Sequence, residues 1–138
     1  MTAEEVIAAL RLEPHPEGGF FREIYRDTQG ARGAATSIYY LLREWEISRW
    51  HRVDAVEIWH FHAGAALELE TADGKGGRRR HTLGTSLDAG QQPQAVVPAG
   101  HWQSARPLGS WTLVGCTVAP AFSFDGFELA PEGWAPTG

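Results

Sequence analysis

Alternation between apolar and charged side chains, which begins at Gly18, is the strongest constraint on the fold of this sequence. The stretch GGFFREIYRD interleaves aromatic and aliphatic residues with Arg and Glu. Because side chains of an extended chain point alternately to opposite faces, this period of two predicts a strand. Further short apolar segments follow, separated by the turn-forming runs GKGG, DAGQQ, PAG and PLG. Many short strands at close spacing predict an all-β sandwich or small barrel.

One helix is expected before the strands. Thr2 and Glu5 match the capping box, in which two side chains satisfy free amide groups of the first turn. The apolar residues that follow recur at helical spacing, and two prolines end the pattern. We expect a short helix over about residues 2–11 and a barrel over about residues 18–130, in a single domain covering 1–138.

Composition excludes several classes of partner. The net charge of −5 argues against nucleic acid, and the one basic run, Arg78 to Arg80, is expected at a solvated hairpin tip. No apolar stretch approaches the roughly 18 residues of a membrane span, and the acidic N-terminus lacks the pattern of a secretory signal. Cys116 is the only cysteine, so we expect a reducing, cytoplasmic location and a core role for this thiol.

Five segments carry a likeness to a known family: PHPEGGFFREIYRD, TSIYYLL, WHRVDAVEIWHFHAG, VVPAGHWQSARP and GCTVAPAFSFDGFELA. With these segments the sequence resembles a cupin, and more closely the cupin-5 family of uncharacterised proteins. The resemblance implies a double-stranded β-helix barrel of the jelly-roll type, with one pocket at its mouth. It also implies a homodimer, which we expect here because open sheet edges are often hidden by a second subunit. No reaction is implied.

The cupin metal motifs match only in part. Glu57 fits the carboxylate position of the first motif, His51 lies near its second histidine position, and Arg49 occupies the first. In the second motif Gln103 occupies the histidine position, and His101 is a substitute if the chain is extended there. A guanidinium cannot bind a cation. We therefore assign no firm cofactor; a divalent metal, if bound, is expected on His51, Glu57 and Gln103.

Strand geometry predicts which side chains near Glu57 face the interior of the barrel. If Glu57 points into the barrel, as the resemblance implies, then Trp59 and Phe61 also do. His60 and His62 then face the other way, although their spacing is typical of a metal site.

The expected pocket therefore combines aromatic walls with a few convergent polar groups, as small-molecule sites usually do. Only one of the adjacent residues Tyr39 and Tyr40 can face inward, and Tyr39 is our candidate proton donor. Arg49 suits an anionic group on the ligand. The full set of candidate residues is His51, Glu57 and Tyr39 for catalysis, and Arg49, Trp59, Phe61, Gln103 and His101 for ligand binding.

Three functions fit these residues. The first is an isomerase or epimerase without a metal, acting on a small polar, sugar-derived metabolite, with His51 as the base and Glu57 orienting it. The second is a metal-dependent dioxygenase or lyase. The third is a non-catalytic protein that binds or senses a small molecule.

Overall fold

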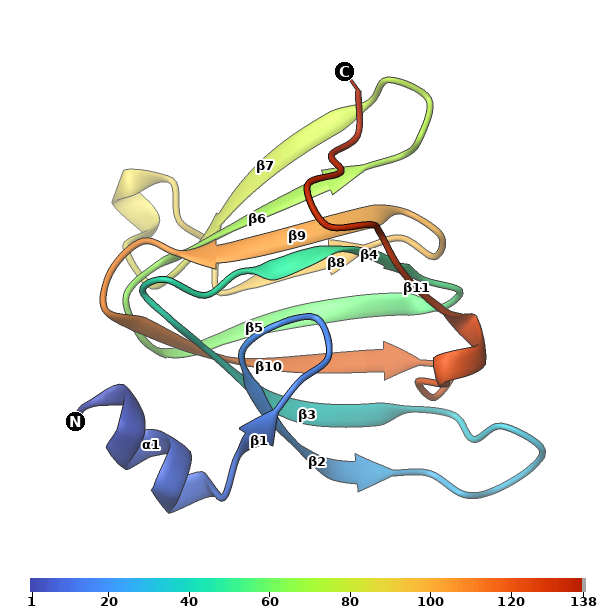
Figure 1. Cartoon of the computed structure of the whole chain (residues 1–138), viewed down its shortest axis with the longest axis horizontal. Helices are drawn as coiled ribbons and strands as arrows, with labels where there is room; N and C mark the ends of the chain where they lie inside the picture. Colours follow the sequence, from blue (N-terminus) through green and yellow to red (C-terminus); the bar gives the residue numbers. More distant parts are fainter. Residues whose placement is uncertain (138) are drawn as a thin grey trace.

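Two antiparallel sheets facing one another make up most of the protein, as the computed structural model shows for residues 1–137 (Figure 1). The first sheet has the strand order β1-β2-β3-β10-β5-β8, and the second has the order β11-β4-β9-β6-β7. The strands of the six-stranded sheet are β1 (Glu13–Pro14), β2 (Phe20–Arg26), β3 (Thr36–Arg43), β10 (Trp111–Ala119), β5 (Val56–Gly64) and β8 (Gln94–Val97). Those of the five-stranded sheet are β11 (Phe127–Leu129), β4 (Ser48–Val53), β9 (Trp102–Pro107), β6 (Leu67–Ala72) and β7 (Arg78–Leu83).

The single α-helix, α1 (Ala3–Leu10), begins as its sequence predicts. Thr2 accepts a hydrogen bond from the amide of Glu5 at 3.1 Å, and the Glu5 carboxylate accepts one from the amide of Thr2 at 2.8 Å. The helix ends before Pro14, because Arg11 adopts the left-handed conformation with φ 56°. Its apolar face packs with Leu41 on the outside of β3. Two short 3₁₀ helices, η1 (Leu87–Ala89) and η2 (Phe124–Gly126), lie in later connections.

The main core lies between the two sheets, where alternate side chains of their strands meet. Trp59, Leu67, Leu69 and Leu83 are fully buried there, and Phe61 packs against them half-buried. On β5 the predicted alternation is confirmed: Glu57 and Trp59 are buried, whereas Ile58 between them is only half-buried and faces outward. Burial of several large apolar side chains, at about 1.5–3 kcal/mol each, holds the sheets together and leaves one end of the interior for a cavity.

The basic run lies on an edge strand instead of a hairpin tip. Arg78, Arg79 and Arg80 form the first half of β7, and all three are exposed. Arg78 pairs with Glu70 at 2.8 Å across the β6–β7 ladder. Charged side chains on an edge strand oppose pairing with another sheet. Within the described residues, no helix is long and apolar enough to cross a membrane.

Candidate functional site

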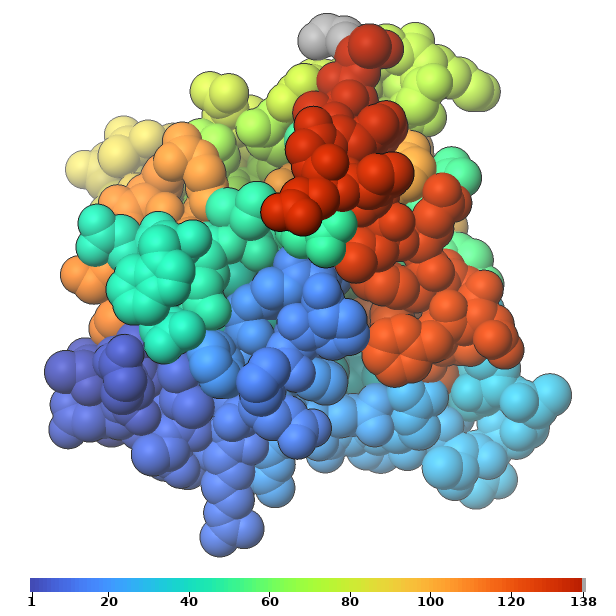
Figure 2. Space-filling model, viewed as in Figure 1, coloured from blue at the N-terminus to red at the C-terminus, as the bar shows by residue number. Residues whose placement is uncertain are grey.

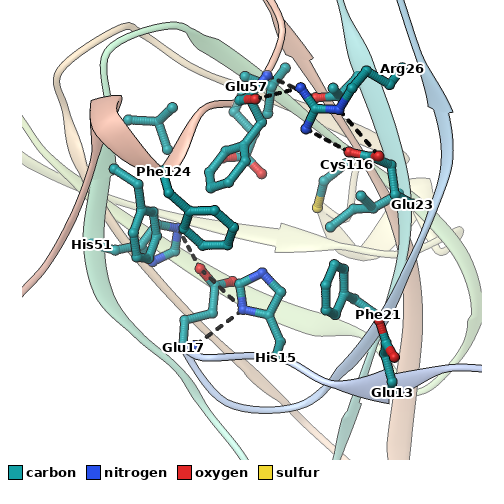
Figure 3. Close-up of a pocket in the computed structure, with 16 residues that line it drawn as sticks. Glu13, His15, Glu17, Phe21, Glu23, Arg26, His51, Glu57, Cys116 and Phe124 are labelled. Carbon is teal, nitrogen blue, oxygen red and sulfur yellow. Dashed lines mark hydrogen bonds and ion pairs between the residues drawn. The ribbon is translucent and has the colours of Figure 1, made fainter.

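A cavity of about 310 Å³ opens between the two sheets, close to the segment that precedes β2. The N-terminal segment and the segment around η2 lie on one face of the molecule beside it, blue and orange-red in Figure 2. Its polar and charged lining residues are Glu13, His15, Glu17, Glu23, Arg26, Thr36, His51, Glu57 and Cys116. The remaining lining residues are apolar, among them Phe21, Phe122, Phe124 and Phe127 (Figure 3).

Of the predicted site residues, His51 and Glu57 line this cavity together, although they come from different sheets. His51 lies on β4 and is 2% exposed, and Glu57 lies on β5 and is 7% exposed. In the view of Figure 3 they approach the cavity from different sides. The roles assigned to the two side chains remain predictions.

His51 has a defined hydrogen-bonding arrangement. Its Nδ1 lies 2.7 Å from the carbonyl oxygen of Arg49, which can only accept, so Nδ1 carries a proton. Its Nε2 lies 3.2 Å from the carboxyl of Glu17. Burial lowers the pKa of His51, against the opposing effects of the Glu57 charge and the Arg49 carbonyl. The imidazole is therefore neutral, with Nε2 as an acceptor that faces Glu17.

Glu17 is the partner that sequence reasoning missed. Its carboxyl is buried, accepts a hydrogen bond from Ser48 Oγ at 2.8 Å, and lies 4.0 Å from His15 Nδ1. Burial raises the pKa of Glu17, although His15 and Ser48 oppose the shift. Because the pKa of His51 is lowered as well, both directions favour a neutral pair in which the Glu17 hydroxyl donates to His51 Nε2.

A glycine turn brings Glu17 inward. Gly18 has φ 107°, and a Cβ there would lie 2.2 Å from the carbonyl oxygen of Ile47, so no other residue fits without a backbone shift. Tyr40, buried on β3, donates a hydrogen bond to the Gly18 carbonyl. The sequence signal was the PEGG stretch, which predicts a tight turn but gives no indication that its acid points into a barrel. His15, in the loop between β1 and β2, also lines the cavity.

Glu57 is held by a chain of neutral side chains. Gln103 Nε2 donates to Glu57 Oε1 at 3.0 Å, and Gln103 Oε1 accepts from Trp59 Nε1 at 2.8 Å. The Cys116 thiol is the other hydrogen-bonding neighbour of the carboxyl. Burial raises the pKa of Glu57 to about 7, with His51 opposing and Glu17 adding to the shift. The carboxyl therefore exchanges its proton near neutral pH.

Arg49 does not line the cavity, and its expected role in binding a ligand anion stays a prediction. The ladder between β4 and β9 shifts register between Ser48 and His51. These two residues are three positions apart and would point to opposite faces of a regular strand, but because of the shift both are buried. Arg49 lies in this irregularity, is only half-buried, and donates to the carbonyl of Ala130 at 2.9 Å. A β-bulge of this kind turns one side chain out of the alternation.

Five other predicted residues also lie outside the cavity lining, one of them Gln103, which bonds to Glu57 from behind. Tyr39 packs against the α1 cluster on the outer face of the sheet, because its neighbour Tyr40 points inward. Trp59 and Phe61 face inward as predicted, but they belong to the core behind the cavity. His101 lies in the turn before β9, where its charged neighbour is Asp73 and not a residue of the cavity. None of these five residues lines the cavity, and the roles assigned to them stay predictions.

His60 and His62 face away from the interior, as the alternation on β5 predicts. His60 Nε2 lies 3.2 Å from Thr117 Oγ1, and the ring of His62 lies edge-on to Tyr39 at 6.2 Å between centroids. Neither residue lines the cavity.

The residues expected to bind a metal do not fit one. Gln103 turns its NH₂ group toward Glu57, so the atom it presents is a donor and not a ligand oxygen. His51 directs its free nitrogen at Glu17. Across residues 1–137, no group of three or more His, Cys, Asp and Glu side chains has the geometry to hold a metal ion. The set His51, Glu57 and Gln103 is thus a poor match to the divalent metal considered from the sequence.

Two solved structures have closely similar architectures. A protein from Shewanella oneidensis is 41% identical, with a TM-score of 0.90 over 94% of this chain and 85% of its own. A hypothetical protein from Leishmania major is 29% identical, with a TM-score of 0.88 over 94% of this chain and 88% of its own. No curated protein matches the sequence.

Oxalate decarboxylase from Bacillus subtilis shares the fold more distantly. It is 15% identical with a TM-score of 0.67, over 84% of this chain and 29% of the enzyme. At that identity the likeness concerns the fold alone, and it confirms the predicted jelly-roll barrel. The family model described as "Cupin superfamily (DUF985)" matches residues 4–130. With that match over nearly its whole length, the chain belongs to this family of the cupin superfamily.

Proposed function

We propose that the cavity binds a small polar metabolite and transfers a proton on it, as an isomerase or epimerase does. The observation that carries this proposal is the position of Glu57 and the Glu17–His51 pair on one cavity whose other walls are largely apolar. Glu57, Glu17 and His51 are buried acid–base groups with shifted pKa values. Such groups in a cleft are typical of functional sites.

The protonation states suit chemistry beside a carbonyl group. The Glu17–His51 pair takes up a proton when the Glu17 hydroxyl passes its own proton to the neutral imidazole. A carboxyl with a pKa of about 7, such as Glu57, gives or takes a proton near neutral pH. Removal of a proton from carbon by one group and its return by the other, on the same or the neighbouring atom, gives epimerisation or isomerisation. A positioned acid–base group contributes about 10²–10⁴-fold in rate.

The size of the cavity limits the ligand. A volume of about 310 Å³ is near the lower end of the range of small-molecule pockets, roughly 300–1,000 Å³. A compound of a few carbons with hydroxyl and carbonyl groups fits this space. Arg49 adds no anion-binding group to this cavity, because that guanidinium donates to Ala130 outside the cavity.

Hydrogen–deuterium exchange at carbon tests the proposal. The protein is incubated in D₂O with hydroxyacetone, dihydroxyacetone, aminoacetone and aldose sugars, and deuterium at the carbon beside the carbonyl is followed by NMR. We expect exchange above the protein-free rate, reduced about 10²-fold or more in His51→Asn and Glu57→Gln. His62→Asn, an exposed histidine on the same strand as Glu57, is the matched control and keeps the wild-type rate. Wild-type exchange no faster than that of His51→Asn would refute the proposal.

A second candidate is binding without turnover. It is favoured by the hydrogen-bond network itself: every fully buried side-chain nitrogen and oxygen within residues 1–137 already has a partner. Such a network is rigid and suits recognition as well as catalysis. This function predicts a ligand-dependent rise in melting temperature with no exchange at carbon, because ligands stabilise the state they bind.

A further inference from the structure

The charge balance of the cavity is acidic. Four carboxyl groups line it, and the one arginine is Arg26. Arg26 makes two bonds to Glu23, at 2.8 and 3.3 Å, and a third to the carbonyl of Phe122 at 2.9 Å. Its guanidinium is therefore already neutralised by a carboxylate of the same lining. No comparable strong cation is left for the other acids.

Glu57 is the acid most in need of a positive partner. It is 7% exposed and has no cationic group within 4.0 Å among residues 1–137. Its hydrogen-bonding neighbours, the Gln103 amide and the Cys116 thiol, are both uncharged. A buried carboxylate without a cation carries a large desolvation cost, and a cation beside it offsets part of that cost.

Phenylalanine rings complete the wall of the cavity. Three of them form a closed cluster, with centroid distances of 5.0 Å for Phe122–Phe124, 5.6 Å for Phe122–Phe127 and 5.9 Å for Phe124–Phe127. Phe21 contributes a fourth ring from β2 (Figure 3). Aromatic faces attract cations, and aromatic rings together with carboxylates are a recurrent means of binding ammonium groups.

We propose that the ligand of this cavity is a small organic cation, with an ammonium group held by Glu57 and the phenylalanine cluster. The inference rests on the proposed function in that it names the substrate class of the same site. A hydroxyl- or carbonyl-bearing amine satisfies both. Its polar end can reach the Glu17–His51 pair while its ammonium group faces Glu57, which as a carboxylate can also accept the proton of the carbon beside the ammonium group.

The proposal has a consequence for pH. Groups that face Glu57 from the surrounding elements are His51 on β4, Gln103 on β9, Cys116 on β10 and Glu17 before β2. Other titratable or charged lining groups are Glu13, His15, Glu23 and Arg26. Burial raises the pKa of Glu57 to about 7. A bound cation lowers this pKa, so binding releases a proton below pH 7 and the affinity rises toward pH 8.

Isothermal titration with choline and its uncharged carbon isostere, 3,3-dimethylbutan-1-ol, tests the charge requirement directly. Titrations are run at pH 6 and 8 with EDTA present, and in two buffers of different ionisation enthalpy so that proton release can be measured. Ethanolamine is titrated in parallel to compare a primary with a quaternary ammonium group. We expect at least one of the two cations to bind about tenfold or more tightly than the isostere at pH 8, with proton release at pH 6. Glu57→Gln removes both the preference and the proton release.

Two further variants keep the result independent of a folding defect in Glu57→Gln. Phe124→Leu changes a ring that is 62% exposed, and we expect it to fold normally and weaken the cation several-fold. Glu128→Gln, an exposed acid on β11 that pairs with Arg52, is the matched control and binds as the wild type does. Equal affinity for choline, ethanolamine and the isostere, or no binding of either cation, overturns the proposal.

The outcome is separable from that of the proposed function. Carbon exchange of hydroxyacetone without binding of either cation retains proton transfer and rejects the cationic ligand. Selective binding of a cation, with no exchange of either hydroxyacetone or aminoacetone, retains the cation site and rejects proton transfer.

Discussion

Gln103 and Glu57 meet at 3.0 Å across the interior, although they lie 46 positions apart and in different sheets. The Gln103 amide is itself oriented by Trp59, whose indole N–H donates to its oxygen. A cavity carboxyl is thereby fixed from behind by two neutral residues that do not line the cavity. Gln103 is a positioning residue, in the place where the cupin pattern has a histidine.

Replacement of Gln103 by leucine leaves the Glu57 carboxyl and the Trp59 N–H without their shared partner. Buried polar groups that lose a partner cost about 1–3 kcal/mol each. We expect the free energy of unfolding, measured with urea at pH 7, to fall by about 2–4 kcal/mol. Gln94→Leu, an exposed glutamine on β8, is the matched control and stays within about 0.5 kcal/mol of the wild type. A loss no larger than that of Gln94→Leu would contradict this role.

Glu57→Gln should change how stability depends on pH. In the unfolded chain the carboxyl loses its proton near pH 4.5, but in the folded protein only near pH 7. Between these values the folded state binds more protons, so the free energy of unfolding contributed by Glu57 falls as the pH rises. A shift of this size corresponds to about 3 kcal/mol.

The measurement is the difference in unfolding free energy between Glu57→Gln and the wild type at several values from pH 4.5 to 8. This difference should increase in favour of the variant by up to about 3 kcal/mol and level off above pH 7. Glu128→Gln changes an exposed acid, and its difference from the wild type should stay nearly constant. A flat profile for Glu57→Gln would show that the carboxyl titrates as it does in the unfolded chain.

His51 should be neutral at pH 7 and protonated on Nδ1. Burial lowers its pKa, and the Arg49 carbonyl 2.7 Å from Nδ1 requires the proton there. ¹⁵N NMR of the imidazole distinguishes this tautomer from the other and from the charged ring, with His51→Asn assigning the signal. A ring charged at pH 7 would mean an ion pair with Glu17 instead of a neutral pair.

Tyr40→Phe tests the turn that carries Glu17. Its hydroxyl donates to the carbonyl of Gly18, and its side chain is 1% exposed, so loss of the bond should cost about 1–3 kcal/mol and weaken ligand binding. Tyr39→Phe is the matched control, because the Tyr39 hydroxyl makes no hydrogen bond within residues 1–137, and it should stay within about 0.5 kcal/mol. Denaturation curves of the two variants give the comparison, and equal losses would contradict it.

Local pattern was enough to predict several features. The capping box placed the start of α1. With Glu57 taken as inward from the family resemblance, the period of two placed His60 and His62 outward on β5. These features depend on neighbours a few residues apart, where backbone geometry alone decides which way a side chain points. The family resemblance supplied the barrel into which those strands close.

Only the tertiary structure decided which residues gather at the cavity. A register shift in β4 turned the Arg49 side chain away from the cavity that His51 lines. A glycine turn brought Glu17, from a distant segment, into contact with His51. Neither contact has a signal in local sequence, because a bulge depends on the partner strand and the inward turn at Gly18 depends on its close approach to Ile47. The pattern of a chain specifies its strands, whereas the composition of a site depends on how distant strands pair.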